Sequence, residues 1–124
     1  MIDFKNASFA KLRPVNDSAF EKMIAPILID EEEIIGCYQG IRDGVVFTSK
    51  RIIAINVQGL TGKKKDFTSL PYSKIQAFSV ETAGVFDLDS ELDLWFSGMG
   101  RIRLEFIGAA DVAYLCKLIS EKVL

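Results

Sequence analysis

Apolar residues follow two different periods along this chain of 124 residues, and the change of period divides it into three parts. Around residues 17–27, and again after Gly108, they recur every three to four positions, as on one side of an amphipathic helix. Between these segments they form short runs or alternate with polar residues, which is typical of strands. The pattern predicts one domain over residues 1–124, with an N-terminal helical segment over 1–30, strands over 33–107 and a C-terminal helix over 109–124.

Local signals limit the N-terminal helix. Asn16 or Asp17 is a candidate N-cap, because short polar side chains accept hydrogen bonds from the free amides of a first helical turn. Pro26 is expected to end or bend the helix near Ala25, since proline has no amide hydrogen and its ring clashes with the preceding turn. Residues 1–15 have no single period, and their expected apolar anchors are Phe4, Phe9 and Leu12.

Seven strands are expected in the middle of the chain, separated by turn-forming residues such as Asp43-Gly44 and Gly98-Met99-Gly100. Their ranges are Ile34–Ile41, Val45–Thr48, Arg51–Val57, Lys63–Leu70, Lys74–Thr82, Ser90–Ser97 and Arg101–Ile107. Most connections are tight turns, which favours antiparallel pairing. The predicted fold is therefore mainly β: a seven-stranded antiparallel barrel or sandwich closed by a C-terminal helix, with an N-terminal helix in addition.

The last two predicted strands alternate regularly between apolar and polar residues. Their apolar residues are expected to face inward, and these are Leu92, Leu94, Phe96, Ile102, Leu104 and Phe106. A three-residue turn would pair Phe96 with Ile102. The same register sets Trp95 opposite Arg103, and Asp93 opposite Glu105, on the outer face.

Two of the predicted strands are apolar on both faces, although a small barrel needs only one apolar face. In Ile34–Ile41 and in Arg51–Val57, residues such as Ile34 and Ile52 have no obvious place in the same core as their neighbours. The second face must be covered by the N-terminal helix or by another subunit. Val85, Phe86 and Leu88 add apolar surface in a long loop. This excess favours self-association into a symmetric homo-oligomer.

Composition and charge exclude several classes of function. Fifteen Lys and Arg against seventeen Asp and Glu give a net charge of −2, whereas nucleic-acid binders normally carry a basic excess. The absence of histidine excludes Ser-His, Cys-His and His-metal sites. Cys37 and Cys116 lack a disulfide or metal spacing and are expected to be reduced thiols. The chain shows no N-terminal signal, so a cytoplasmic location is expected.

The predicted plan, strands followed by one C-terminal amphipathic helix, resembles the pleckstrin-homology (PH) barrel, and the chain is similar to the bacterial PH-like family in particular. Two segments carry the resemblance: Gly44–Asn56, with its Thr-Ser-Lys-Arg turn between two β-rich runs, and Lys64–Ile75, in which a strand ends at Pro71 before the next begins. The similarity extends over about residues 15–124. It implies a non-enzymatic domain that forms symmetric homo-oligomers and has no assigned ligand.

Eukaryotic PH domains bind inositol phosphates through Lys and Arg residues between the first two strands. In this chain that loop is Gly40–Gly44, with a single Arg42 beside Asp43. The resemblance therefore does not carry a phosphoinositide site over to this protein.

The only basic run, Lys63, Lys64 and Lys65, has two interpretations. Lysines often protect the edge of a sheet from further pairing. They could equally contact a phosphate, an acidic partner or a membrane surface, although three lysines alone contribute too little for stable anchoring. Arg42, Lys50 and Arg51 are candidates to extend this patch.

Trp95 also has several interpretations, since the alternation directs it away from the core. It could stack on Arg103, be covered by Phe4 or Phe9, or lie in a subunit interface, where Trp and Arg are favoured anchors. The expected interface residues are Trp95, Arg103, Ile52 and Ile34.

No pattern of catalytic, cofactor-binding or metal-binding residues emerges. Asp87, Asp89 and Glu91 begin like a calcium loop, but Leu92 stands where the loop requires glycine. The chain is thus expected to be a non-catalytic homo-oligomeric binding or scaffolding module without a cofactor. The alternative is a peripheral membrane or anionic-ligand binder that uses Lys63–Lys65.

Overall fold

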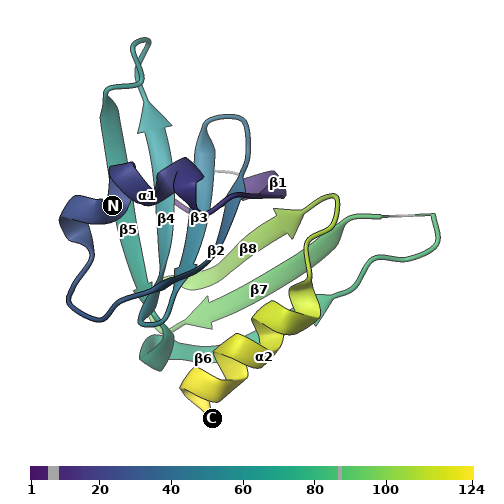
Figure 1. Cartoon of the computed structure of the whole chain (residues 1–124). Coiled ribbons are helices and arrows are strands. Elements are labelled where there is room, and N and C mark those ends of the chain that lie inside the picture. Colours follow the sequence, from purple (N-terminus) through teal and green to yellow (C-terminus); the bar gives the residue numbers. More distant parts are fainter. Residues whose placement is uncertain (6–8, 87) are drawn as a thin grey trace.

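The computed structural model of the chain describes residues 1–5, 9–86 and 88–124. One sheet with the strand order β5-β4-β3-β2-β1-β8-β7-β6 bends into two halves, β2–β5 and β6–β8, that β1 joins (Figure 1). The strands are β1 (Phe9–Val15), β2 (Ile34–Gln39), β3 (Asp43–Thr48), β4 (Arg51–Gln58), β5 (Lys64–Pro71), β6 (Ile75–Glu81), β7 (Ser90–Phe96) and β8 (Gly100–Phe106). The helices are α1 (Ser18–Ile24) and α2 (Val112–Val123), with 3-10 turns η1 (Ala25–Ile27) and η2 (Tyr72–Lys74).

The mainly β fold with a helix near each end is confirmed, but the expected seven antiparallel strands in a closed barrel are wrong. The sheet has eight strands, is mixed and stays open, because β5 and β6 are its two edges. The unforeseen strand is β1, which is antiparallel to β2 and parallel to β8. Its period is broken by a register shift between Phe9 and Leu12 and by the left-handed backbone of Lys11 (φ 55°).

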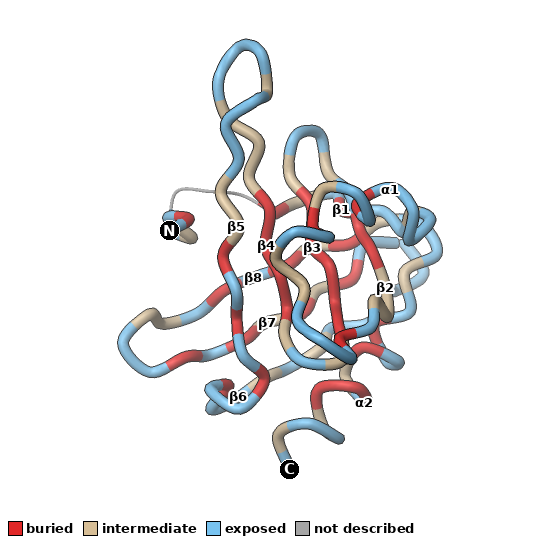
Figure 2. The backbone as a smooth tube through the Cα atoms, turned by 60° about the vertical axis from the view of Figure 1, so that its left-hand side comes forward, coloured by how far each residue is buried: buried red, intermediate tan, exposed pale blue. Residues whose placement is uncertain are grey.

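The interior has two hydrophobic layers. The main core lies between the two halves of the sheet and includes residues of α2, among them Leu115 and Ile119. A second cluster lies between α1 and the outer face of β2–β4, and consists of Phe20, Ile24, Cys37, Val46, Ile53 and Ile55. Figure 2 shows runs of consecutive buried residues along β3 and β4, and consecutive strand residues point to opposite faces. The N-terminal helix is therefore the element that covers the second apolar face of β2 and β4.

The predicted helix signals correspond to observed features. Helix α1 ends at Ile24 and the chain continues as the 3-10 turn that contains Pro26, as the missing proline amide requires. Asp17 stands at the N-cap position, while the Asn16 side chain accepts a hydrogen bond from the Ser18 amide at 3.0 Å. Helix α2 starts at Val112, later than expected, and the Asp111 side chain caps it by accepting from the amide of Tyr114 at 3.0 Å.

The register of the β7–β8 hairpin differs from the expected one by two residues. Phe96 pairs with Gly100 instead of Ile102, Trp95 lies opposite Arg101, and Asp93 lies opposite Arg103. The turn still has three residues but lies one position earlier, over Ser97–Met99, which shifts the pairing by two. Gly98 and Gly100 have positive φ angles of 83° and 81°, which glycine adopts without strain. An even shift keeps every side chain on its predicted face, so the inward apolar set is unchanged.

The packing of α1 makes a residue-specific prediction. A Cβ added to Gly44 would lie 2.4 Å from Cζ of Phe20, whose ring is buried in the second cluster. We expect Gly44→Ala to lower the free energy of unfolding by about 1–3 kcal/mol, because the ring has no free space to move into. Urea unfolding followed by circular dichroism measures this.

A double variant tests the stated cause. Phe20→Leu shortens the clashing side chain, so it should remove part of the cost of Gly44→Ala. Strictly additive effects of the two substitutions would contradict the contact as the source of the destabilisation.

Candidate interaction surfaces

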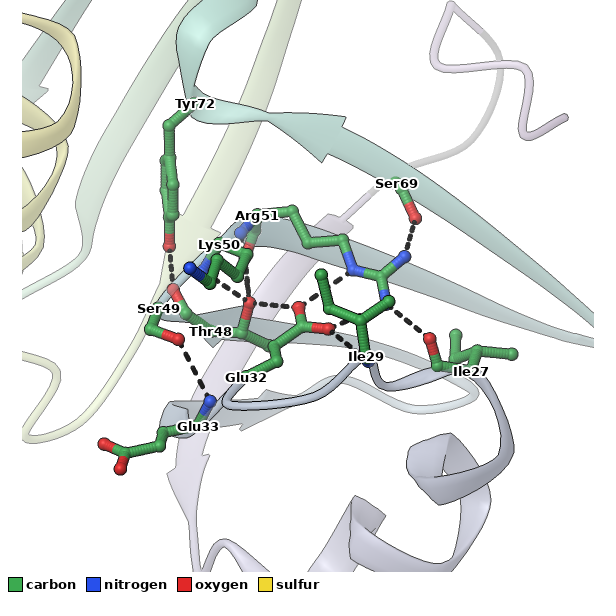
Figure 3. A network of polar contacts seen from close by, with 10 residues as sticks. All are labelled: Ile27, Ile29, Glu32, Glu33, Thr48, Ser49, Lys50, Arg51, Ser69 and Tyr72. Carbon is green, nitrogen blue, oxygen red and sulfur yellow. Dashed lines mark hydrogen bonds and ion pairs between the residues drawn. The ribbon is translucent and has the colours of Figure 1, made fainter.

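The Thr-Ser-Lys-Arg turn between β3 and β4 surrounds a buried carboxylate (Figure 3). The Glu32 side chain is fully buried and accepts hydrogen bonds from Thr48 Oγ1 at 2.6 Å and from the Ile29 amide at 3.1 Å. Arg51 donates to the same carboxylate through Nε at 2.9 Å and Nη2 at 3.0 Å. The charge of Glu32 is thus paired and hydrogen-bonded, as a buried charge must be.

Arg51 extends this network to other elements. Its guanidinium also donates to the Ile27 carbonyl at 2.6 Å and to Ser69 Oγ on β5 at 2.9 Å. Thr48 Oγ1 accepts from the amides of Lys50 and Arg51, which closes the turn. Arg51 lies at the opposite end of β4 from Lys64 and is neutralised by Glu32, so it does not extend the basic patch.

These contacts set the protonation of Glu32. Burial alone would raise the pKa of this carboxyl, but the hydrogen bonds from Arg51, Thr48 and the Ile29 amide, together with the Arg51 charge, hold it below its ordinary value of 4.5. A pKa that is lower in the folded chain contributes stability above the unfolded value, and this contribution is lost as the pH falls through the folded pKa.

We therefore expect part of the stability of the domain to disappear as the pH falls below about 4.5, and Glu32→Gln to lose that part of the pH dependence. At pH 7 the same substitution should cost about 3–5 kcal/mol, because Arg51 then lacks its anionic partner. Urea unfolding at a series of pH values measures both effects.

Glu33 provides the matched control. Its side chain is exposed, while its backbone amide and carbonyl form hydrogen bonds with Ser49 of the same turn. Glu33→Gln should change neither the stability nor its pH profile. Equal losses in the two variants would show that the buried ion pair is not their cause.

Trp95 lies on the outer face of β7, where 49% of its side-chain surface is exposed. The expected cover by Phe4 or Phe9 is not observed, because these two rings contact each other and belong to the main core. Trp95 instead adjoins Ala77 of β6 and Arg101 of β8, and these residues line a shallow hollow of about 220 Å³ together with Phe78, Ser79, Asp93 and Leu94.

Arg103 is directed to carboxylates and not to the indole ring. It forms a bidentate ion pair with Asp93, in which Nε and Nη2 lie 2.9 and 3.1 Å from the two carboxylate oxygens. Its Nη1 lies 3.5 Å from Oε2 of Glu91. The hydrogen bonds to Asp93 raise the pKa of this guanidinium, so it stays charged. The outer face of β7 and β8 therefore carries a ladder of opposite charges beside Trp95.

The other two predicted interface residues lie away from this face. Ile52 is fully buried in the main core, so it is not on the surface of the folded domain. Ile34 is half-buried and packs against the second cluster beneath α1. The structure thus separates both isoleucines from Trp95 and Arg103.

Lys63, Lys64 and Lys65 lie at the end of the long β4–β5 hairpin and are exposed, at the start of the edge strand β5. Figure 2 shows this hairpin extending beyond the body of the domain. Arg42, in the neighbouring β2–β3 turn, donates a hydrogen bond to the carbonyl of Gly59 at the hairpin turn. Of the suggested additional cations, Arg42 therefore joins the lysines, whereas Lys50 lies beside Arg51 in the β3–β4 turn at the other end of β4.

Sequence reasoning missed two apolar residues at the same end of the domain. Ile41 is 93% exposed in the β2–β3 turn, and Leu60 is fully exposed at the tip of the β4–β5 hairpin. A single exposed leucine is not a signal in a sequence. The register of three hairpins, which brings Arg42 to Gly59, is what places the two turns together.

Reactive and metal-ligating groups do not gather on the part of the chain that the structure describes. Within residues 1–5, 9–86 and 88–124 there is no group of three Cys, Asp or Glu side chains placed to hold a metal ion. Asp87 of the suggested calcium loop lies outside the described residues. Burial raises the pKa of the Cys37 thiol to about 12, and Cys116 is also a free thiol. None of the described helices is long and apolar enough to span a membrane.

Comparison with known proteins agrees with this architecture. The chain is 41% identical to a DUF1696 family protein with a pleckstrin-homology domain from Shewanella loihica PV-4, over 93% of this chain and 99% of that one, with a TM-score of 0.79. It is 43% identical to a pleckstrin homology domain from Shewanella amazonensis SB2B, over 96% and 93% of the two chains, with a TM-score of 0.66.

Two uncharacterized proteins of Bacillus subtilis (strain 168), YjqA and YozO, are similar in sequence. YjqA is 49% identical over 84 residues, which are 68% of this chain and 67% of YjqA. YozO is 33% identical over 99 residues, which are 80% and 85% of the two chains. The family profile described as "Bacterial PH domain" matches residues 3–123. The chain belongs to the bacterial PH domain family, as its Thr-Ser-Lys-Arg turn and Pro71 corner indicated.

Proposed function

We propose that this PH domain is a non-catalytic, homo-oligomeric binding module whose subunits associate through the outer face of β6–β8, next to Trp95. The half-exposed tryptophan on a face that no described helix covers carries the proposal. The non-catalytic role is supported by membership of a PH domain family and by relatives whose names state no reaction.

The two outer faces of the bent sheet differ in their cover. Helix α1 lies on the outer face of β2–β4, and α2 packs into the main core from the inner side of β6 and β7. The outer face of β6–β8 has no such helix in the described residues (Figure 1). A binding partner would therefore remove the exposed apolar surface of Trp95 from water. Burial of such surface stabilises an interface.

The edge of the sheet beside Trp95 is also poorly protected. The edge strand β5 carries Lys64, Lys65 and Asp66 and ends at Pro71, and charges and proline discourage pairing with another strand. The edge strand β6 has the sequence Ile-Gln-Ala-Phe-Ser-Val-Glu, with one charged residue, Glu81. A second copy that docks on β6 would satisfy free backbone groups and cover Trp95 at once.

The charge ladder on the same face favours a specific contact. Arg103 alternates with Asp93 and Glu91 across β7 and β8, so a partner must place its own charges in register. Surface charge complementarity contributes specificity more than affinity. In a symmetric contact each copy presents both signs, so Arg103 of one copy can face a carboxylate of the other.

Light scattering on a sizing column tests the interface. We expect the wild type to elute as a defined oligomer and Trp95→Glu to elute as a folded monomer, because the new carboxylate would be desolvated at the contact. Tyr114 offers a matched control: it is 52% exposed but lies on α2, and Tyr114→Glu should leave the oligomer intact.

A monomeric wild type would overturn the oligomer proposal. If the oligomer persists in Trp95→Glu but dissociates in Tyr114→Glu, the interface lies on α2 and the proposed face is incorrect.

A second candidate function is peripheral binding to an anionic membrane through the end of the domain that carries Lys63–Lys65 and Arg42. The exposed side chains of Ile41 and Leu60 favour it, because apolar side chains beside a basic surface can insert into the headgroup region of a bilayer. Each lysine near an anionic surface contributes about 1 kcal/mol, and a buried apolar side chain adds to this.

Sedimentation with vesicles of phosphatidylcholine and phosphatidylserine tests this function. We expect binding that weakens with salt, a loss of about a hundredfold at most when all three lysines become Gln, and a weaker interaction for Leu60→Asp. Val85→Asp is the control, because Val85 is also highly exposed but lies on the β6–β7 loop and not on the β2–β3 or β4–β5 turn. Binding that ignores salt and Leu60 would exclude this function.

A further inference from the structure

The gap between the two sheet edges contains a pocket that neither proposed surface uses. It has a volume of about 430 Å³ and lies where β5 ends, η2 turns the chain and β6 begins, with the β7–β8 turn as its other wall. Its apolar wall includes Ile75, Phe96 and Met99, and its polar rim includes Ser73, Lys74 and Gln76. Pockets of this volume and mixture accommodate small organic ligands.

The wall of the pocket is held by the core. The hydroxyl of Tyr72, the first residue of η2, donates to the Thr48 carbonyl at 2.7 Å, and its ring is buried. Helix α2 packs against η2 from the other side. Because Tyr72 points inward, the short turn presents the next two residues, Ser73 and Lys74, at the surface. The site is therefore preformed, which reduces the entropic cost of binding.

The polar side chains at the rim are available. Among the described residues, the side chains of Ser73, Lys74 and Gln76 make no hydrogen bond or ion pair within the chain. Lys74 is the only charged residue that lines the pocket, so its ammonium group faces no carboxylate there. A pocket with one uncompensated cation beside an apolar wall is complementary to an anion with an apolar body.

We propose that this corner pocket binds a small amphipathic monoanion, an organic carboxylate of about eight to ten carbons in all with an unbranched apolar chain. The carboxylate pairs with Lys74 and accepts hydrogen bonds from Ser73 or Gln76, while the chain lies against Ile75, Phe96 and Met99. One lysine without an arginine fork suits a single carboxylate better than a polyphosphate. The site is separate from Trp95 and Lys63–Lys65 and goes beyond the proposed function.

Titration of the nitrogen-15-labelled full chain with octanoate, below its micelle concentration, tests the site by NMR. We expect amide shifts at Ser73–Gln76 and Ser97–Gly100, and a clearly weaker response to 1-octanol, which has the same apolar body without the charge. Lys74→Gln should weaken octanoate binding about threefold to fivefold and leave octanol binding unchanged.

Two further variants separate this site from the other proposals. Lys117→Gln removes an exposed lysine of α2 and should bind octanoate as the wild type does. Trp95→Glu should also bind octanoate normally, since Trp95 does not line the pocket. Shifts outside the corner, an equal response to octanol, or no effect of Lys74→Gln would each overturn the proposal.

Discussion

The buried ion pair between Glu32 and Arg51 connects the N-terminal helical segment to the sheet. Glu32 lies in the connection between α1 and β2, Arg51 begins β4, and Ser69 lies on β5. The guanidinium also reaches the Ile27 carbonyl, so it fixes the end of the helical segment that covers the second apolar face. If either charge were lost, the other would remain in a poorly solvated position. Helix α1, which covers β2–β4, would then lose the contact that holds its C-terminal end.

The same pair gives the Thr-Ser-Lys-Arg turn a structural role. Thr48 caps the turn and donates to Glu32, while Arg51 neutralises the carboxylate. These residues were recognisable in the sequence as a pattern, but their partner Glu32 was not. It is one of three consecutive glutamates, and only the tertiary structure determines which one turns inward.

The elements that the sequence predicted well have strong local causes, and those it missed depend on distant contacts. Helix α1 ends before Pro26, and the inward faces of β7 and β8 follow strict alternation, so both were predictable. Strand β1 was missed because its alternation is interrupted at Lys11 and its partners come from opposite ends of the chain. On the surface, strict alternation was enough to predict that Trp95 faces outward. The proximity of Leu60, Ile41 and Arg42 was not predictable, because it depends on the register of three hairpins.

The parallel pairing of β1 with β8 has a consequence for the order of events during synthesis. Phe9 pairs with Leu104, and between them lies almost the whole β-sheet. On the ribosome, β1–β5 and α1 can assemble from local hairpins, but β1 keeps one free edge and the main core stays open until β8 has been made. The nascent half-sheet therefore exposes Phe47, Ile52 and Leu70 to water, and transiently exposed apolar surface of this kind promotes aggregation.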